Sequence, residues 1–580
     1  MSSSQDVELG SSTDEPIDPQ TLDWDGPEDM DNPHNWSNLK KWYATMVAAL
    51  LCLVVTMGSS LYVAGVPELV VSYGVNETLA LAGLTFYLLG LSTVIGAPLS
   101  EVFGRKPIYV ASLPLSMLFT MGVGLSGGKM RVILPLRFFS GVFASPALSV
   151  ASGTIVDIWD MDEVSIAMAF FCLAPFLGPV ISPVMAGFAA QSKGWRWPSW
   201  IQLIAGGIIL PFIVFMPETH KTVLLTKRAK KRKLNLKVLT KEDRKKFMKL
   251  TLTITVFRPI KMLFVEPIVL FFSIYVAFIF AVLFGFFEAY GVIFRGVYHM
   301  SLGLSGLPFI GIGVGLWLGV IFYIFIDRRY FFPPAPAGTP PLLHPTSMRT
   351  APFRGHRDPE TGHLEPLKPE RFLLICKVGA ISLPIGLFWL GWSAKASVHW
   401  MAPVSAGVPF GFGLILIFFS VMMYFSASYP PFFVASALAA NNLLRYITCC
   451  IFPLFTLQMY ERLHIDWATS LFAFVCLGML PLPWIFERYG ERLRKRSTFG
   501  SNVLEKEAEE EEETPEEIII RKSQSHHPTD AQSLAESSTE MSSKEKKYDN
   551  DTEVVLDTTS APSLQTAGSR ISNMACVYNV

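Results

Sequence analysis

The chain has 580 residues, of which 51% are hydrophobic and 17% are charged, and its 48 basic and 48 acidic side chains leave no formal net charge. This balance argues against a nucleic-acid-binding protein, which needs a basic surface. Charged residues gather at the two ends and in two internal stretches, and the long segments between them are apolar enough to cross a bilayer. The composition therefore predicts an all-α polytopic membrane protein.

Residues 1–41 are polar and acidic, and they lack both apolar periodicity and the pattern of a cleavable signal peptide. We expect a disordered tail there. Twelve apolar segments follow, six within 42–216 and six within 263–487, which predicts two six-helix bundles. The expected spans run near 42–65, 78–98, 107–126, 132–155, 164–188, 198–216, 266–291, 305–327, 371–393, 400–424, 433–458 and 466–487.

Basic residues are distributed unevenly among the loops that join these segments. The odd-numbered loops hold few, whereas the even-numbered ones, above all the segment 217–262, hold many. Because lysine and arginine favour cytoplasmic loops, both termini are expected in the cytoplasm, and 217–262 is expected to be a basic cytoplasmic loop that contacts anionic lipid. Asn76, in the sequon Asn76-Glu-Thr78, would then lie on the outer side and accept a glycan.

Two further segments are polar. The insert 331–369 is rich in proline and is expected to be an extended cytoplasmic loop. Its three histidines, His344, His356 and His363, are too loosely spaced to suggest a metal site. The segment 488–580 is expected to be a disordered cytoplasmic tail.

The loop between the second and third spans is the first place where charge interrupts the apolar sequence. It carries Glu101, Gly104, Arg105 and Lys106. Because apolar spans flank it on both sides, this glycine turn must lie at a membrane surface, and its cations favour the cytoplasmic one.

Arg137 lies inside the fourth span, where a guanidinium costs roughly 2.5 to 3.5 kcal/mol. We therefore expect it to face a cavity or a partner rather than lipid, on a helix face that it shares with Gly141, Ser145 and Ser152. Two interpretations stay open: Arg137 acts on the substrate, or it holds helices together by bonding backbone carbonyls. The cost of an intramembrane ion favours the first.

Two other spans carry polar groups at membrane depth. Glu288 lies toward the outer end of the seventh span, close to Tyr290, where a desolvated carboxylate can carry a proton or can simply extend to the outer surface. In the eleventh span Asn441, Arg445 and Thr448 share one helix face, a second cationic stripe that matches Arg137 in the other half.

The fifth span contains three prolines spaced by four residues, Pro175, Pro179 and Pro183, together with Gly178. Each proline removes a backbone hydrogen bond and crowds the preceding turn, so this helix is expected to bend. It is a candidate gate, and a static kink is the alternative.

Motifs of catalysis are missing from the sequence. There is no GxSxG elbow, no phosphate-binding GxxxxGK[ST] loop and no HExxH pair, and the seven cysteines form no CxxC pair. The sequence therefore predicts a protein that is not an enzyme and that uses no cofactor, metal or ATP.

At these residues the sequence resembles the major facilitator superfamily, and specifically its twelve-span drug:proton antiporter branch as found in fungi, over about residues 23–496. The loop signature of the family falls on 97–106, where Ala97, Glu101 and Val102 replace its leading glycine, aspartate and first arginine. The other resembling positions are Arg137 and Gly141, then Pro175, Gly178 and Pro179, and the segments 32–36 and 216–219.

The resemblance implies two six-helix bundles around a central cavity that opens alternately to each side. In this scheme Arg105 pairs with Asp157, at the end of the fourth span, while Glu101 faces a helix start in the other bundle, and both contacts close the inner gate. Protonation of a carboxylate, with Glu288 as the first candidate, or substrate binding at Arg137 would shift the balance between the two states.

We therefore expect a plasma-membrane secondary transporter that exports a small organic compound, such as a secondary metabolite, an organic acid, a glycolipid or a drug, by proton antiport. Its partners would be that compound, protons and the lipid bilayer, and it would act as a monomer without nucleic acid or ATP. The two intramembrane arginines favour an anionic or neutral cargo over polyamines. Proton-coupled nutrient uptake and a non-transporting receptor are the alternatives.

Overall fold

The computed structural model describes residues 22–26, 29–93, 96–160, 163–233, 257–334, 355, 367–497 and 499. The chain divides after Leu493, and the helical bundle lies in the unit Met1–Leu493. The predictions for 1–21, for most of the central loop, for most of the insert 331–369 and for the tail after 499 lie outside the described residues.

Long helices make up the first half of the chain, and short 3-10 turns join some of them. In chain order the elements are η1 (Pro33–Asn35), α1 (Asn38–Ser60), η2 (Leu61–Gly65), α2 (Val66–Tyr73), α3 (Glu77–Leu91), α4 (Gly96–Phe103), α5 (Arg105–Leu125), α6 (Met130–Val156), α7 (Val164–Lys193), α8 (Trp197–Phe215) and α9 (Lys221–Lys231).

The second half repeats this pattern of long helices. Its elements are α11 (Pro267–Tyr290), η3 (Gly291–Val297), η4 (Leu304–Gly306), α12 (Phe309–Ile326), η5 (Asp327–Phe331), η6 (Pro369–Phe372), α13 (Leu373–Ser393), α14 (Met401–Ser428), α15 (Pro431–Met479) and α16 (Leu482–Lys495).

Twelve membrane spans result within the described residues. Ten helices are long and apolar enough to cross a membrane, and the pair α3 and α4, bent by 41°, supplies one more. The helix α15 holds two spans, because His464 breaks it with a left-handed φ of 61°. The predicted fold class, an all-α membrane protein of twelve spans in two bundles, is confirmed.

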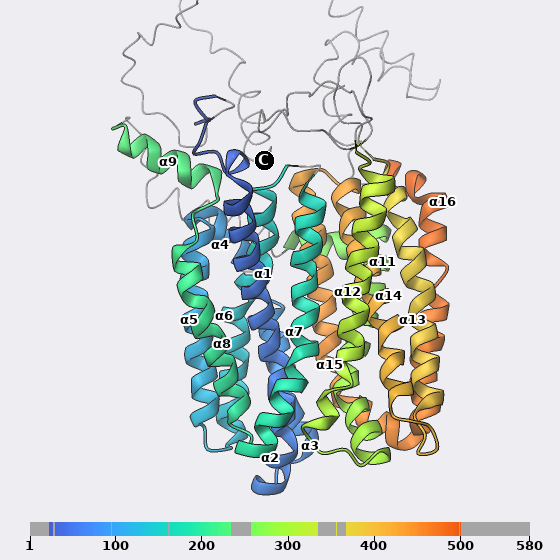
Figure 1. Cartoon of the computed structure of the whole chain (residues 1–580). Coiled ribbons are helices and arrows are strands. Elements are labelled where there is room, and N and C mark those ends of the chain that lie inside the picture. Colours follow the sequence, from blue (N-terminus) through green and yellow to red (C-terminus); the bar gives the residue numbers. More distant parts are fainter. Residues whose placement is uncertain are drawn as a thin grey trace, which may run out of the picture. The chain divides into compact units, whose positions relative to one another are not determined.

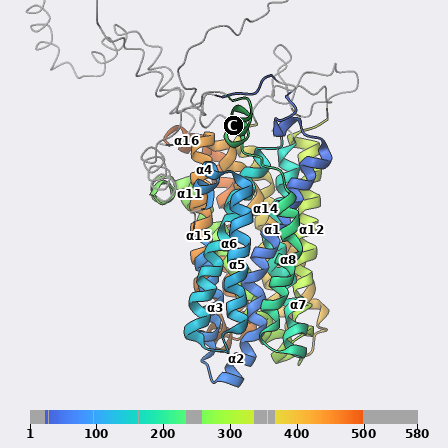
Figure 2. The same ribbon diagram turned by 90° about the vertical axis from the view of Figure 1, so that its left-hand side faces the viewer.

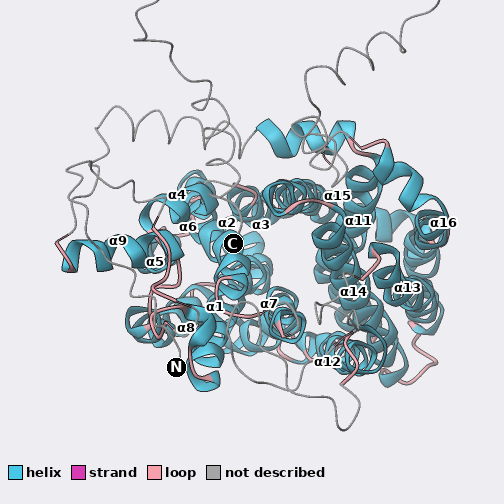
Figure 3. Ribbon diagram, turned by 90° about the horizontal axis from the view of Figure 1, so that it is seen from above, coloured by secondary structure: helices cyan, strands magenta, loops and turns pink. Residues whose placement is uncertain are grey.

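The two halves pack as separate bundles that meet along two seams. In the first half α1 lies against α6 and α7, α3 against α6, and α5 against α6 and α8, whereas in the second α11 lies against α15 and α13 against α14 and α15 (Figures 1 and 2). Between the halves α7 packs on α12 and α3 packs on α15. Figure 3 shows both sets of helices end-on, with α7 beside α12 at the centre.

Glycine lets α3 and α6 touch backbone to backbone. A Cβ atom on Gly141 would lie 2.2 Å from the carbonyl oxygen of Tyr87, and one on Gly90 would lie 2.3 Å from the carbonyl oxygen of Phe138. Neither distance is compatible with a side chain, so both positions require glycine. The small-residue stripe predicted around Gly141 therefore serves close helix packing in this structure.

The segment between the bundles contains a helix that its charge alone did not predict. In α9 the side chains of Leu225 and Ala229 are buried, whereas Lys227, Lys230 and Lys231 are exposed, as is Arg232 just after the helix. Residues 221–231 contain neither proline nor glycine, so a helix forms once these two apolar residues find a surface to cover. We use "the α9 end" for this end of the bundle and "the α2 end" for the opposite one (Figure 1).

The backbone contact at Gly141 predicts a stability effect that one methyl group can test. Gly141→Ala should lower the midpoint of thermal unfolding in detergent, with a cost of about 1 to 3 kcal/mol for overpacking. Gly207→Ala in α8 is the matched control, since no heavy atom lies within 4 Å of its added methyl group. Equal midpoints for the two variants would contradict the close packing of α3 on α6.

Candidate functional site

A cluster of charged groups lies where α5 begins, at the α9 end. Arg105 donates from Nε to Asp157 Oδ2 at 3.1 Å and from Nη1 to Ser100 Oγ at 2.7 Å. Asp157 follows the last residue of α6, so this pair joins the start of α5 to the end of α6. The predicted pairing of Arg105 with Asp157 is confirmed, and its role as a gate stays a prediction.

Glu218 completes this cluster from the segment after α8. Its carboxylate accepts hydrogen bonds from the backbone N–H groups of Arg105, at 2.9 Å, and of Lys106, at 3.2 Å. An anion is stabilised at these first N–H groups of a helix. Gly104 leaves room for it, because its φ is 95° and a Cβ there would lie 2.6 Å from Glu218 Oε2.

Sequence reasoning noticed the segment 216–219 only as a resemblance and gave Glu218 no role. The available signal was an acidic residue just after the sixth span, on the same membrane side as the start of the third. Glu101 lies in α4, half-buried and within electrostatic range of Arg105 and Asp157. Its predicted contact with a helix start in the other bundle stays a prediction.

Arg137 is held by backbone groups of two neighbouring helices. Its three nitrogens donate to the carbonyls of Gly58 at 2.8 Å, Ser59 at 3.2 Å and Gly83 at 3.0 Å. The guanidinium also lies over the rings of Tyr62 and Tyr87, at 4.7 and 4.4 Å from their centroids. Arg137 is only 3% exposed. These contacts are those of the packing alternative, because the side chain joins α6 to α1 and α3.

Arg445, the counterpart of Arg137 in the second half, has far fewer partners. Its Nη2 donates to Asn442 Oδ1 at 2.8 Å, while Nε and Nη1 have no hydrogen-bond partner among the described residues. The guanidinium lies among the rings of Phe280, Phe418 and Tyr446, at 4.6 to 5.0 Å from their centroids.

Aromatic side chains from both halves close the space beside Arg445. The ring of Phe176, on α7, lies 5.0 Å from that of Phe280 and 4.8 Å from that of Phe418. Asn441, one turn before Arg445, donates to Ser273 Oγ at 3.4 Å and is buried as well. Neither Asn441 nor Arg445 lines the cavity that opens toward the α2 end.

A cavity of about 240 Å³ opens between the two halves toward the α2 end. Glu288, 8% exposed, and Tyr290 contribute to its wall, together with Glu77 from the start of α3 and Arg295 from η3. Glu288 Oε1 has no hydrogen-bond partner among the described residues. The remaining lining is mostly apolar or hydroxyl-bearing and includes Ser60, Val63, Pro183, Ser305, Phe309 and Leu457.

The prolines of α7 lie along the seam between the halves. The helix runs without interruption through Pro175, Pro179 and Pro183, and Pro183 lines the cavity. A Cβ on Gly178 would lie 2.2 Å from Thr56 Oγ1, so this glycine lets α1 approach α7 closely. The role of these residues as a gate stays a prediction.

Comparisons with known proteins agree on one family. The sequence profile described as Major Facilitator Superfamily matches residues 48–453. "Polyamine transporter 4" of Saccharomyces cerevisiae is 70% identical over 497 residues, which cover 85% of this chain and 75% of that protein. "Major facilitator superfamily multidrug transporter mdrA" of Aspergillus fumigatus is 35% identical over 508 residues, or 85% and 77% of the two chains. Among solved structures, the proton:xylose symporter XylE has a TM-score of 0.53 at 15% identity, covering 78% of this chain and 97% of that one, which shows a shared fold.

The contacts of Arg137 predict that its planar guanidinium, and not only its charge, holds three helices together. Arg137→Lys keeps the charge but cannot reach all three carbonyls, so it should lower the thermal midpoint, at about 1 to 3 kcal/mol for each buried carbonyl left unpaired. Arg131→Lys, at an exposed position of the same helix, is the matched control. An unchanged midpoint would remove the packing role and return Arg137 to the groups that contact cargo.

Proposed function

The chain belongs to the major facilitator superfamily, and on this basis we propose that it exports a small organic cation of the polyamine class in exchange for protons. The chain is a multi-pass membrane transporter and not an enzyme, because its family, relatives and fold are those of transporters. The cargo, the direction and the coupled ion are the parts that we propose.

The acidic lining of the cavity carries the proposal. Glu288 and Glu77 both line the cavity, with Arg295 as its one basic residue among the described lining groups. Neither intramembrane arginine lines the cavity: the guanidinium of Arg137 is held by backbone carbonyls and ring faces, and that of Arg445 is enclosed by aromatic rings. The preference for an anionic or neutral cargo that these arginines suggested therefore loses its basis. A relative named as a polyamine transporter, at 70% identity, supports a cationic cargo.

Exchange follows if proton and cargo compete for one carboxylate. Glu288 is buried, and its Oε1 lacks a described partner, so the site holds either a proton or a cationic group. Binding of one excludes the other, which is the requirement of antiport. The apolar lining around Phe309 and Leu457 fits a methylene chain between charged amines. Arg445 and Asn441 would lie further along the same passage, beyond the aromatic rings.

In this proposal the α9 end and the α2 end of the transporter would open alternately. The Arg105–Asp157 pair and the Glu218 cap hold α5 and α6 together at the α9 end, while the cavity lies toward the α2 end. We place the α9 end in the cytoplasm and the transporter in the plasma membrane, because the basic residues of the even-numbered loops lie at that end.

Removal of the Glu288 charge tests the coupling. Glu288→Gln should reduce pH-gradient-driven spermidine flux in sealed vesicles at least tenfold, because the amide can neither release a proton nor pair with an amine. Glu461→Gln, at an exposed position of α15, is the matched control and should leave the flux unchanged. Flux opposite to the proton movement supports export, flux with the protons indicates uptake, and no flux in the unaltered chain would contradict a transporter of this cargo.

The orientation has its own test at Asn76, which caps α3 by accepting a hydrogen bond from the Thr78 N–H at 2.9 Å. Asn76 is exposed at the α2 end, and its amide nitrogen is the atom that a glycan would occupy. If this end faces outward, Asn76→Gln should abolish a glycosidase-sensitive mobility shift of the protein from cells. Absence of any shift in the unaltered chain, with a reporter sequon accepted in the tail, would place this end in the cytoplasm.

A further inference from the structure

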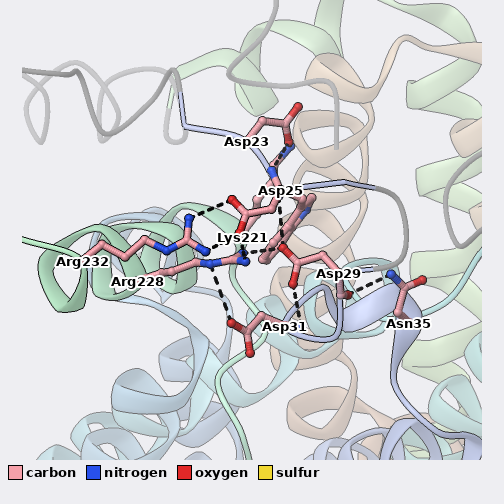
Figure 4. Close-up of polar contacts among 9 residues, drawn as sticks. Asp23, Asp25, Asp29, Asp31, Asn35, Lys221, Arg228 and Arg232 are labelled. Carbon is pink, nitrogen blue, oxygen red and sulfur yellow. Dashed lines mark hydrogen bonds and ion pairs between the residues drawn. The ribbon is translucent and has the colours of Figure 1, made fainter. Parts of the chain in front are cut away.

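An acidic segment that precedes the first span is bound to α9 by ion pairs. We call residues 23–26 and 29–31 the acidic strap. Lys221 pairs with Asp23 at 3.0 Å, Arg228 pairs with Asp25 and Asp29, and Arg232 donates to Asp25 at 2.8 Å. Figure 4 shows both arginines extended from one side of α9 toward these aspartates. The strap thus occupies one face of the helix.

On the opposite face of α9 the charged residues are all lysines. Residues 221–233 hold seven cations and no anion. Lys221, Arg228 and Arg232 lie on the same helix face as the buried Leu225 and Ala229, whereas Lys227, Lys230 and Lys231 project from the other side and are exposed. The strap therefore leaves much of the positive charge of α9 exposed to its surroundings.

The position of α9 suggests what those lysines meet. The helix extends sideways from the α9 end of the bundle, outward past α5, in both the side view and the view from above (Figures 1 and 3). Because α5 spans the membrane, the region beyond its end is where lipid headgroups lie. A basic helix at this depth is attracted by anionic headgroups.

The strap and α9 are both connected, within a few residues, to the predicted gate formed by Arg105, Asp157 and Glu218. Beyond the strap, His34 Nδ1 lies 3.1 Å from Asp160 Oδ1, and Lys41 Nζ lies 3.8 Å from Asp160 Oδ2. Asp160 follows the gate residue Asp157 by three positions, and α9 begins three positions after Glu218. A change at the strap is therefore transmitted over only a few residues.

We propose that anionic lipid headgroups, attracted by the lysine face of α9, displace the acidic strap because they repel its aspartates, so that the strap is docked in a neutral membrane and released in an anionic one. The outer ion pairs of the strap are suited to displacement, because the side chains of Asp23 and Asp31 are 75% and 69% exposed and such pairs are weak and screened by salt, whereas the Arg228–Asp29 pair is more enclosed, with the Asp29 side chain 6% exposed. Acidity is not the trigger: the hydrogen bond from Arg232 lowers the pKa of Asp25, so its carboxylate stays charged far below neutral pH.

The test measures the distance between strap and helix in the full-length chain, without any need for transport. Spin labels at Met30→Cys and Thr226→Cys report it by double electron–electron resonance, with Cys576→Ser as background; the six cysteines of the described spans are buried. In phosphatidylcholine vesicles we expect one short distance. With 40% phosphatidylserine we expect most of the population to shift to longer, broader distances, and an unchanged distribution would overturn the proposal.

Three comparisons make this result specific. Asp25→Asn with Asp29→Asn should release the strap even in phosphatidylcholine. Lys227→Gln, Lys230→Gln and Lys231→Gln together should keep it docked at 40% phosphatidylserine, whereas Lys129→Gln with Lys395→Gln, at the α2 end, should release it as the unaltered chain does. Release in the triple-lysine variant, or release by inorganic phosphate in phosphatidylcholine at matched ionic strength, would contradict a role of the lipid surface. Loss of spermidine flux alone would concern the proposed function and not this displacement.

Discussion

A lipid bilayer offers no hydrogen bonds, so every charge that the spans bury must be matched from within the protein. This constraint explains most of the polar contacts in the structure. Arg137 donates hydrogen bonds to three backbone carbonyls, and Arg105 forms an ion pair with Asp157. Glu218 accepts hydrogen bonds from the first N–H groups of α5. Each of these contacts joins elements that are distant in the sequence. The ions thereby hold together helices that have no hydrophobic reason to associate in lipid.

Among the described residues, Glu288 and Arg445 depart from this rule, and this departure is the reason for proposing a functional role for Glu288. Glu288 keeps an unpartnered oxygen toward the cavity, and Arg445 keeps two unpartnered nitrogens among aromatic rings. Arg137 and Arg445 occupy corresponding spans of the two halves, yet only Arg137 has a hydrogen-bond partner at each of its three nitrogens. The two halves therefore share a fold but differ in how their intramembrane arginines are held.

The sequence predicted the fold well because hydropathy and loop charge are local properties. Twelve spans, the division into two bundles and the sites of the costly ions all followed from such signals. The partners did not, because carbonyls such as that of Gly83 belong to every residue and become specific only when helices pack. For the same reason the sequence left two readings of Arg137 open. Glu218 and the helix α9 were missed since each depends on a contact across the fold. The helix break at His464 falls between the predicted spans 433–458 and 466–487, although no proline or glycine marks it.

The charged cluster at the start of α5, the predicted gate, is connected directly to segments outside the spans. Glu218 lies in the segment that leads into α9, and its carboxylate fixes the backbone of Arg105, whose side chain holds Asp157. In the proposed transport cycle this cluster would change when the α9 end opens, and both neighbouring segments would move with it. Whatever binds α9 or the segment before α1 therefore contributes free energy to one state of the gate. On the proposed scheme, the membrane surface would bias the transporter without any change in the cavity itself.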